Sequence, residues 1–198
     1  MSDAIVRLKI VLADTEPPIW RRVEVPAALT LKDLHAVIQA AMGWQDYHLY
    51  QFHVGRQTIA GPGMGGEGFG VPRAIGAGRV RLDEFAANGI KRFVYVYDMG
   101  DSWEHRLQIE KLLAADPSAS YPRLVDGALR CPPEDVGGIP GFYEFLEAVA
   151  DPKHPDHDVR IEWYGGPFDP ADMDAARIHK DLARIAARRK RAAAKRAS

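Results

Sequence analysis

The sequence predicts an α+β protein with a mixed, mainly antiparallel sheet and helices packed on one side of that sheet. Three observations indicate this class. Apolar and polar residues alternate in two stretches near the N-terminus and in a pair of stretches near the middle of the chain. Helical spacing of apolar residues follows the first two stretches, and two more helical segments lie near the C-terminus. Strands and helices therefore do not alternate one by one, as they do in a parallel α/β sheet.

The first two strands and the first helix follow from the spacing of apolar residues. Residues 4–12 alternate between apolar and polar side chains, and residues 19–26 do the same between flanking prolines. Thr30 is a suitable N-cap and Gly43 a suitable helix end, and the stretch between them has apolar side chains at helical spacing. The spacing therefore predicts a hairpin followed by a helix.

Two further strand regions come next. The aromatic residues within 47–54 favour a strand, so the opening order is β-β-α-β, which resembles a β-grasp arrangement. Residues 91–110 predict a hairpin, with Gly100 in the turn, where glycine tolerates a positive φ. The first strand of this hairpin is apolar or aromatic on both faces. We therefore expect the hairpin to lie at the centre of the sheet.

The C-terminal half divides into a proline-rich connection and two helices. Residues 114–141 hold several prolines and glycines and predict no regular element. Residues 141–150 predict a short helix, and Asp169 with the following proline predicts the start of the last helix. The apolar stripe of that helix ends near Ile185. We therefore expect residues 1–186 to form one domain and residues 187–198 to form a basic tail that frays.

Length and composition narrow the class of protein. With 198 residues, of which 46% are hydrophobic and 27% charged, the chain has the composition of one globular domain. Its single cysteine, Cys131, excludes an intramolecular disulfide and a zinc site built from several cysteines. No apolar run approaches the roughly 18 residues of a transmembrane helix, and charged residues interrupt the apolar N-terminus, unlike in a signal peptide. We therefore expect a cytoplasmic protein without membrane contact.

Charge is distributed unevenly along the chain. From Arg177 onward there are nine basic residues and one acidic residue, or +8, which leaves 17 basic and 26 acidic residues, or −9, in the rest. Such an asymmetry favours an anionic partner, and nucleic acid bound weakly through the tail is the partner that we expect. Alternatively, the cations only suit the C-terminal end of a solvated helix. The candidate contacts in the tail are Arg188, Arg189, Lys190, Arg191, Lys195 and Arg196.

Polar residues on otherwise apolar strands mark a candidate pocket. His105 shares a strand face with Trp103 and Leu107, and a buried histidine there needs a partner. If the preceding turn has an even length, Asp98 lies opposite Trp103 and within reach of His105, whereas an odd length prevents this pairing. His48 shares its strand face with aromatic residues in the same way. The candidate pocket comprises Asp98, Asp101, His105, His48, His35, Glu134 and Asp135.

Two interpretations of this set remain open. Asp98, His105 and Glu134 offer imidazole and carboxylate groups, which could hold a divalent metal or act as an acid–base pair. Alternatively, Asp98 and Asp101 only cap a turn and the histidines belong to the core. Other motifs are not found: the glycine-rich segment 61–70 lacks the Gly-Lys-Ser/Thr ending of a phosphate loop, and no Gly-x-Ser-x-Gly nucleophile motif occurs.

Six segments together resemble a known family. In order, they are PPIWRRVEVP, TLKDLHAVIQAAMGW, HLYQF, YVYDMGDSWEHRLQIE, CPPEDVGGIPGFYEFL and WYGGPFDP. They are similar to the plasmid pRiA4b ORF-3-like family, some members of which are labelled as passenger or resolvase-like proteins of insertion sequences. The resemblance covers residues 5 to about 185. One small departure is Met99, where a phenylalanine is commoner in the family.

The resemblance implies a single α+β domain associated with plasmids and mobile genetic elements, and it implies no particular reaction. The resolvase-like label has no chemical counterpart here, because neither a serine nor a tyrosine nucleophile lies in the expected setting of arginine and histidine partners. Three functions remain as alternatives. The first is a binding or accessory domain that contacts nucleic acid through the tail. The second is a metal- or carboxylate-dependent enzyme, and the third is a protein-interaction module.

Overall fold

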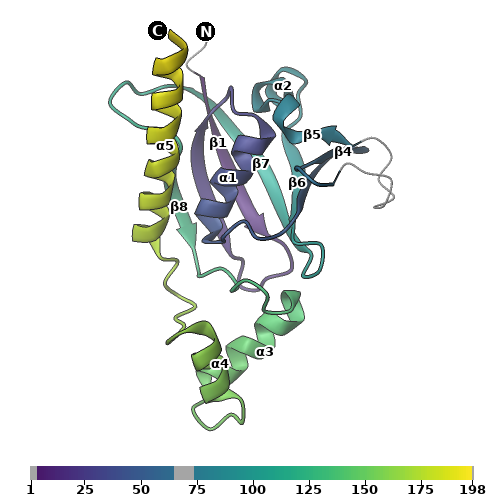
Figure 1. Cartoon of the computed structure of the whole chain (residues 1–198), viewed down its shortest axis with the longest axis vertical. Coiled ribbons are helices and arrows are strands. Elements are labelled where there is room, and N and C mark those ends of the chain that lie inside the picture. Colours follow the sequence, from purple (N-terminus) through teal and green to yellow (C-terminus); the bar gives the residue numbers. More distant parts are fainter. Residues whose placement is uncertain (1–3, 65–73, 198) are drawn as a thin grey trace.

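The computed structural model describes residues 4–64 and 74–197, and within these ranges the chain forms an α+β fold (Figure 1). In chain order, the strands are β1 (Ala4–Leu12), β2 (Trp20–Pro26), β3 (Tyr50–Val54), β4 (Gln57–Ala60), β5 (Ile75–Gly76), β6 (Arg92–Tyr97), β7 (Trp103–Ala114) and β8 (Arg123–Ala128). The helices are α1 (Leu31–Met42), the 3-10 turn η1 (Ala77–Arg79), α2 (Leu82–Ala87), α3 (Gly138–Ala150), α4 (His157–Tyr164) and α5 (Ala175–Ala197). Most of the glycine-rich segment 61–70 lies outside the described residues.

The sheet is mixed and mainly antiparallel, as predicted. Its strand order is β5-β4-β3-β6-β7-β1-β2-β8, and every neighbouring pair is antiparallel except β4 and β5. The β6–β7 hairpin lies in the middle of this order, which confirms its predicted central position. The opening order β-β-α-β is also confirmed, but β3 pairs with β6, so two strands separate it from β1.

The core lies between one face of the sheet and two helices. Figure 1 shows α1 crossing that face and α5 running beside it, next to β8. Alternate side chains of β1 are buried against the helices, as the sequence pattern predicts. Helix α1 begins at its predicted cap, because the Thr30 hydroxyl accepts a hydrogen bond from the Asp33 N–H at 3.1 Å. It ends at Gly43, whose φ of 85° is the left-handed conformation that favours glycine.

The last helix differs from the prediction at both of its ends. It begins at Ala175 rather than at Asp169, because residues 169–174 form turns and the Asp174 carboxylate accepts a hydrogen bond from the N–H of Arg177. At the other end it continues as helix to Ala197, where the sequence predicts a frayed tail from residue 187. Arg189 contacts Asp33 of α1 at 3.3 Å and so ties the tail to the body.

Six elements were not predicted from the sequence: β4, β5, η1 and α2, which lie between β3 and β6, and also β8 and α4. Strand β8 lies within the proline-rich connection 114–141, and α4 follows the polar loop after α3. Figure 1 shows α3 and α4 together below the end of the sheet. None of the helices in the described ranges is both long enough and apolar enough to cross a membrane.

A buried carboxylate joins three strands on the opposite face of the sheet. Glu24 on β2 is 1% exposed, and its oxygens lie 2.7 Å from nitrogens of both Arg7 and Arg123. Burial by itself raises the pKa of Glu24, but hydrogen bonds from the two arginines outweigh it and hold the pKa below the ordinary value. Glu24 therefore carries its charge in the folded protein and links β1, β2 and β8.

We predict that Glu24→Gln lowers the free energy of unfolding by about 2 kcal/mol at pH 7, because two arginines lose their shared partner. The lowered pKa of Glu24 also fixes the sign of the pH dependence. The stabilisation by Glu24 is complete above the pKa of about 4.3 that a glutamate has in the unfolded chain. It disappears as the pH falls through the pKa that Glu24 has in the folded protein. Urea unfolding at pH 7 and at pH 3 measures both effects. Glu110→Gln is the matched control, since Glu110 pairs with Arg22 in a more exposed position, and an equal loss in both variants would contradict the prediction.

Candidate functional site

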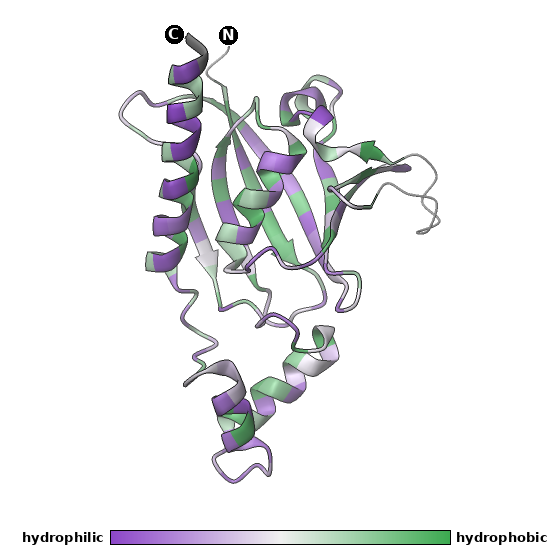
Figure 2. Ribbon diagram, in the orientation of Figure 1, coloured by the Kyte–Doolittle hydropathy of each residue, from purple (hydrophilic) through white to green (hydrophobic). Residues whose placement is uncertain are grey.

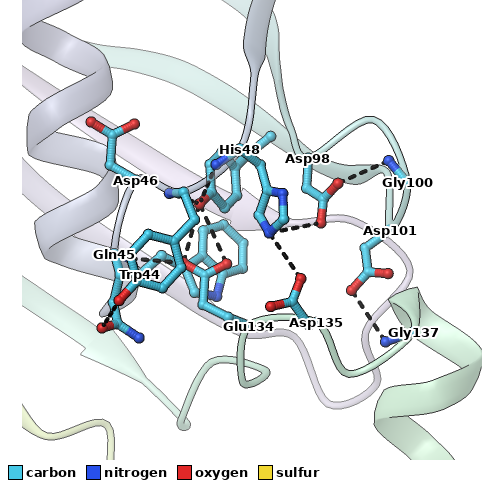
Figure 3. A network of polar contacts seen from close by, with 12 residues as sticks. Trp44, Gln45, Asp46, His48, Asp98, Gly100, Asp101, Glu134, Asp135 and Gly137 are labelled. Atoms are coloured by element: carbon cyan, nitrogen blue, oxygen red, sulfur yellow. Dashed lines mark hydrogen bonds and ion pairs between the residues drawn. The ribbon is translucent and has the colours of Figure 1, made fainter.

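Three connections converge at one end of the sheet. They are the segment between α1 and β3, the turn between β6 and β7, and the segment between β8 and α3 (Figure 3). Backbone groups join them: the Asp98 N–H donates to the Leu49 carbonyl at 2.9 Å. The Gln45 N–H donates to the Glu134 carboxylate at 2.7 Å. Polar residues that are far apart in the sequence are thereby gathered in one place.

Asp98 is held in a fixed orientation at the end of β6. Its backbone has a φ of 57°, a left-handed conformation that aspartate tolerates better than most residues. One carboxylate oxygen accepts a hydrogen bond from the Gly100 N–H at 2.8 Å. The other oxygen faces His48, and the side chain is only 10% exposed. The turn therefore fixes one carboxylate oxygen and directs the second one towards the histidine.

His48 lies between two carboxylates (Figure 3). Its Nε2 is 2.9 Å from an oxygen of Asp135 and 3.6 Å from an oxygen of Asp98. Neither oxygen completes a hydrogen bond with this nitrogen, which is shielded from solvent and has no hydrogen-bond partner in the described part of the chain. The three side chains each offer one ligand atom, and these atoms lie within 4.8 Å of one another. We call His48, Asp98 and Asp135 the cation cluster, because one imidazole and two carboxylates are a suitable donor set for a divalent metal.

Glu134 and Tyr97 form a second polar group beside the cation cluster. The Tyr97 hydroxyl donates to the Glu134 carboxylate at 3.1 Å and accepts hydrogen bonds from the N–H groups of Tyr47 and His48. Burial raises the pKa of Tyr97, and the charge of Glu134 raises it further, so the hydroxyl stays protonated. Burial also raises the pKa of Glu134, although hydrogen bonds from Gln45 and Tyr97 oppose this shift. Glu134 is therefore a partly buried carboxyl group beside the cation cluster, with a pKa above its ordinary value.

His105 does not join the cation cluster. Tyr97 pairs with Trp103 and Tyr95 with His105, so the intervening turn has the odd length that prevents the pairing with Asp98. The proposed metal set of Asp98, His105 and Glu134 is accordingly not formed in the structure. His105 is instead fully buried, with its ring 5.1 Å from that of Trp44.

The buried imidazole of His105 has no hydrogen bond of normal geometry with the described residues. Burial lowers its pKa to about 4, and interactions with the backbone of Tyr95 and Trp103 oppose this shift without reversing it. His105 is therefore neutral at pH 7 and packs as a core residue.

His35 and Asp101 are near the cluster but have partners of their own. His35 is bonded at 2.7 Å to the Tyr95 hydroxyl and at 2.8 Å to the Asp46 carboxylate. Asp101 accepts a hydrogen bond from the Gly137 N–H at 3.1 Å. A Cβ on Gly138 would lie 2.8 Å from the Asp101 carbonyl oxygen, so only glycine allows this approach. Asp101 thus positions the segment that carries Glu134 and Asp135.

Sequence reasoning missed Tyr97 and Gln45. In the sequence, Tyr97 is one of the aromatic residues of the first hairpin strand, and in the structure it is fully buried. Its hydroxyl, however, reaches the end of the sheet and contacts Glu134. The available signal was its position directly before Asp98, where the strand ends. Gln45 contributes a backbone N–H, which the type of side chain cannot reveal.

The fold and the site define an α+β protein with an open sheet and a polar cluster of one histidine and two aspartates at one sheet end. This chain belongs to the plasmid pRiA4b ORF-3-like protein family, whose model matches residues 4–177. It is 42% identical over 190 residues to "Uncharacterized protein y4hQ" of Sinorhizobium fredii, and the match covers 95% of each chain.

A crystal structure of a "Protein of Unknown Function", MM3350 from Methanosarcina mazei Go1, has the same fold. The TM-score is 0.79 and the sequence identity 31%, over 92% of this chain and 98% of that one. The relatives therefore establish the family and the fold, while their names state no activity.

We predict that His105→Ala lowers the free energy of unfolding by about 3 kcal/mol, because it leaves a cavity in the core. His105→Leu, which is similar in volume, should cost less than about 1.5 kcal/mol. The wild-type protein should also gain stability as the pH rises from about 4 to 6.5, the window in which only unfolded His105 is protonated, and the leucine variant should lose this slope. Thermal melting across that pH range, with cation titration in parallel, measures these effects. Loss of cation binding in His105→Leu would contradict the structural role.

Proposed function

We propose that the protein is a cytoplasmic accessory protein of plasmids and insertion sequences that binds a divalent cation at His48, Asp98 and Asp135. The observation that carries this proposal is the Nε2 atom of His48. It is buried without a hydrogen-bond partner among the described residues, and it faces two carboxylates. The 2.9 Å contact with Asp135 is an ion pair without hydrogen-bond alignment, so Nε2 is incompletely satisfied, and full loss of such a hydrogen bond costs about 1–3 kcal/mol. A bound cation would accept its lone pair and neutralise both aspartates.

The donor set also indicates the chemistry. Three protein ligands leave coordination positions for water or for an oxygen of a ligand, as in catalytic rather than structural metal sites. Mixed nitrogen and oxygen donors suit Mn²⁺, Fe²⁺ or Zn²⁺ better than they suit Mg²⁺ or Ca²⁺. Glu134 lies beside the cluster with a raised pKa, which favours a role as proton acceptor for a cation-bound water.

We predict that the purified, chelator-treated protein binds one Mn²⁺ or Zn²⁺ per chain in isothermal titration calorimetry. His48→Gln and Asp98→Asn should each weaken this binding at least about tenfold, because each removes a ligand. Glu104→Gln is the matched control: it removes an exposed carboxylate on β7, just after the same turn and outside the cluster. Binding that is unaffected by His48→Gln, or equally weakened by Glu104→Gln, would contradict the proposal.

A second candidate function is contact with nucleic acid along α5. Six basic side chains recur every three or four residues and are all exposed, which places them on one side of the helix. Figure 2 shows hydrophilic residues along the visible side of α5. This basic stripe comprises Arg177, Lys180, Arg184, Arg188, Arg191 and Lys195. It spans about 27 Å at 1.5 Å per residue, and Asp181 is the acidic residue beside it.

The basic stripe differs in part from the contacts expected from the sequence. Arg188, Arg191 and Lys195 belong to it. Arg189 is instead turned towards α1, where it pairs with Asp33, and Lys190 lies off the stripe. The side chain of Arg196 is outside the described residues. A row of cations on a rigid helix supports backbone contact with phosphates, which carries no sequence information.

We predict that the triple variant Arg184→Gln, Arg188→Gln, Arg191→Gln binds duplex DNA more weakly than the wild type. The slope of log K against log salt should fall by about 2–3, because each lost phosphate contact contributes about 0.9. Fluorescence anisotropy of a labelled duplex at several salt concentrations measures this slope. The control triple Arg56→Gln, Arg92→Gln, Lys111→Gln has the same change of net charge at exposed positions elsewhere. Equal losses in the two triples would reject a specific role for α5.

A further inference from the structure

A cleft of about 360 Å³ lies between α1, α5 and the segment before β3. Its lining includes Lys32, His35, Asp46, His48, Tyr50 and Arg188. His48 also belongs to the cation cluster, so the cleft and the cation cluster share a residue. Arg188 belongs to the basic stripe of α5, so the cleft also touches that surface. It is therefore the place where the two proposed binding features meet.

Tyr50 gives the cleft a buried hydrogen-bond donor without a partner. The residue is 5% exposed, and its hydroxyl has no hydrogen bond with the described residues. Its ring stacks on that of His35, with centroids 3.5 Å apart and planes 7° from parallel. A tyrosine hydroxyl carries its proton at neutral pH and can therefore act as a donor here. A ligand with an acceptor oxygen would satisfy this donor.

Two cations in the cleft are not engaged, whereas both carboxylates near them are. Lys32 and Arg188 are exposed and form no ion pair within the described ranges. Asp33 pairs with Arg189 at 3.3 Å. Asp46 accepts a hydrogen bond at 2.8 Å from His35, which is neutral because burial lowers its pKa, so this contact is not an ion pair. The lining therefore has two unpaired cations against one carboxylate without a cationic partner, and this net positive charge favours an anionic ligand.

We propose that this cleft binds the phosphate group of a phosphate ester, with Lys32 and Arg188 beside its charge and the Tyr50 hydroxyl donating a hydrogen bond to it. The inference rests on the proposed function, since it names the ligand class of the cation site next to the cleft. The phosphate comes either from a nucleic-acid strand that follows the basic stripe or from a small phosphate compound.

The test is binding of two probes, inorganic phosphate and a fluorescent twelve-nucleotide single strand, to the full chain at low salt in the presence of a chelator. Tyr50→Phe removes only the hydroxyl, so its melting temperature should equal that of the wild type. It should weaken binding about tenfold, the effect of one hydrogen bond to a charged group. Arg188→Gln should do the same. Arg191→Gln, one turn further along the basic stripe and outside the cleft, should change binding less than twofold.

Each outcome decides the proposal. Weaker probe binding in both Tyr50→Phe and Arg188→Gln supports the cleft as the phosphate site. The probe that binds then identifies the source of the phosphate as a nucleic-acid strand or a small phosphate compound. No saturable binding of either probe, no effect of Tyr50→Phe, or equal effects of Arg188→Gln and Arg191→Gln would overturn it. The chelator separates this test from that of the cation cluster. Phosphate binding without any metal binding would reject only the cation site, and metal binding without phosphate binding would reject only the cleft.

Discussion

One buried arginine connects the elements on which the rest of the structure depends. Arg21 on β2 is 1% exposed, and its guanidinium donates to the carbonyls of Ala41, Ala128 and Leu129 at 2.8–2.9 Å. It forms no ion pair in the described part of the chain, so carbonyl dipoles balance its charge, including one at the C-terminal end of α1. Space for it depends on Gly127, where a Cβ would lie 2.9 Å from the Arg21 side chain. A single guanidinium group thereby fixes the positions of β2, α1 and the end of β8 relative to one another.

The position of the candidate site depends on the same contacts. Arg21 also contacts the Cys131 sulfur at 3.3 Å, at the start of the segment that carries Glu134 and Asp135. The next contact along that segment is the Trp44 indole N–H, which donates to the Pro132 carbonyl at 2.9 Å. The segment is thus fixed to the end of α1 before it reaches the cation cluster. Two carboxylates from distant parts of the chain can face one histidine because their backbones are already held.

The spacing of apolar residues was sufficient to predict the elements that have a continuous buried face, namely β1, α1 and the central hairpin. It failed for α4, which has no buried residue and therefore no apolar stripe, and for the edge strand β8, where Leu124 is the buried residue. The polar residues of the site were found because they interrupt apolar segments. Their grouping was wrong for His105, because the parity of a turn is not visible in strand alternation and a neutral imidazole can stay in a core. Which loops meet at the sheet end depends on contacts such as those of Arg21, which spacing does not encode.

Helix α5 combines packing and charge in a way that defines how it can bind. Its apolar side, with Ile178 and Leu182, is buried against the body, so this side is not free to enter a lipid surface. The basic stripe faces outwards, and contacts made through it are electrostatic and weaken with salt. Arg189 is anchored to Asp33 of α1, and the neighbouring Arg188 lines the cleft. The burial of one side of α5 therefore determines both the exposure of the basic stripe and the point at which it reaches the cleft beside His48.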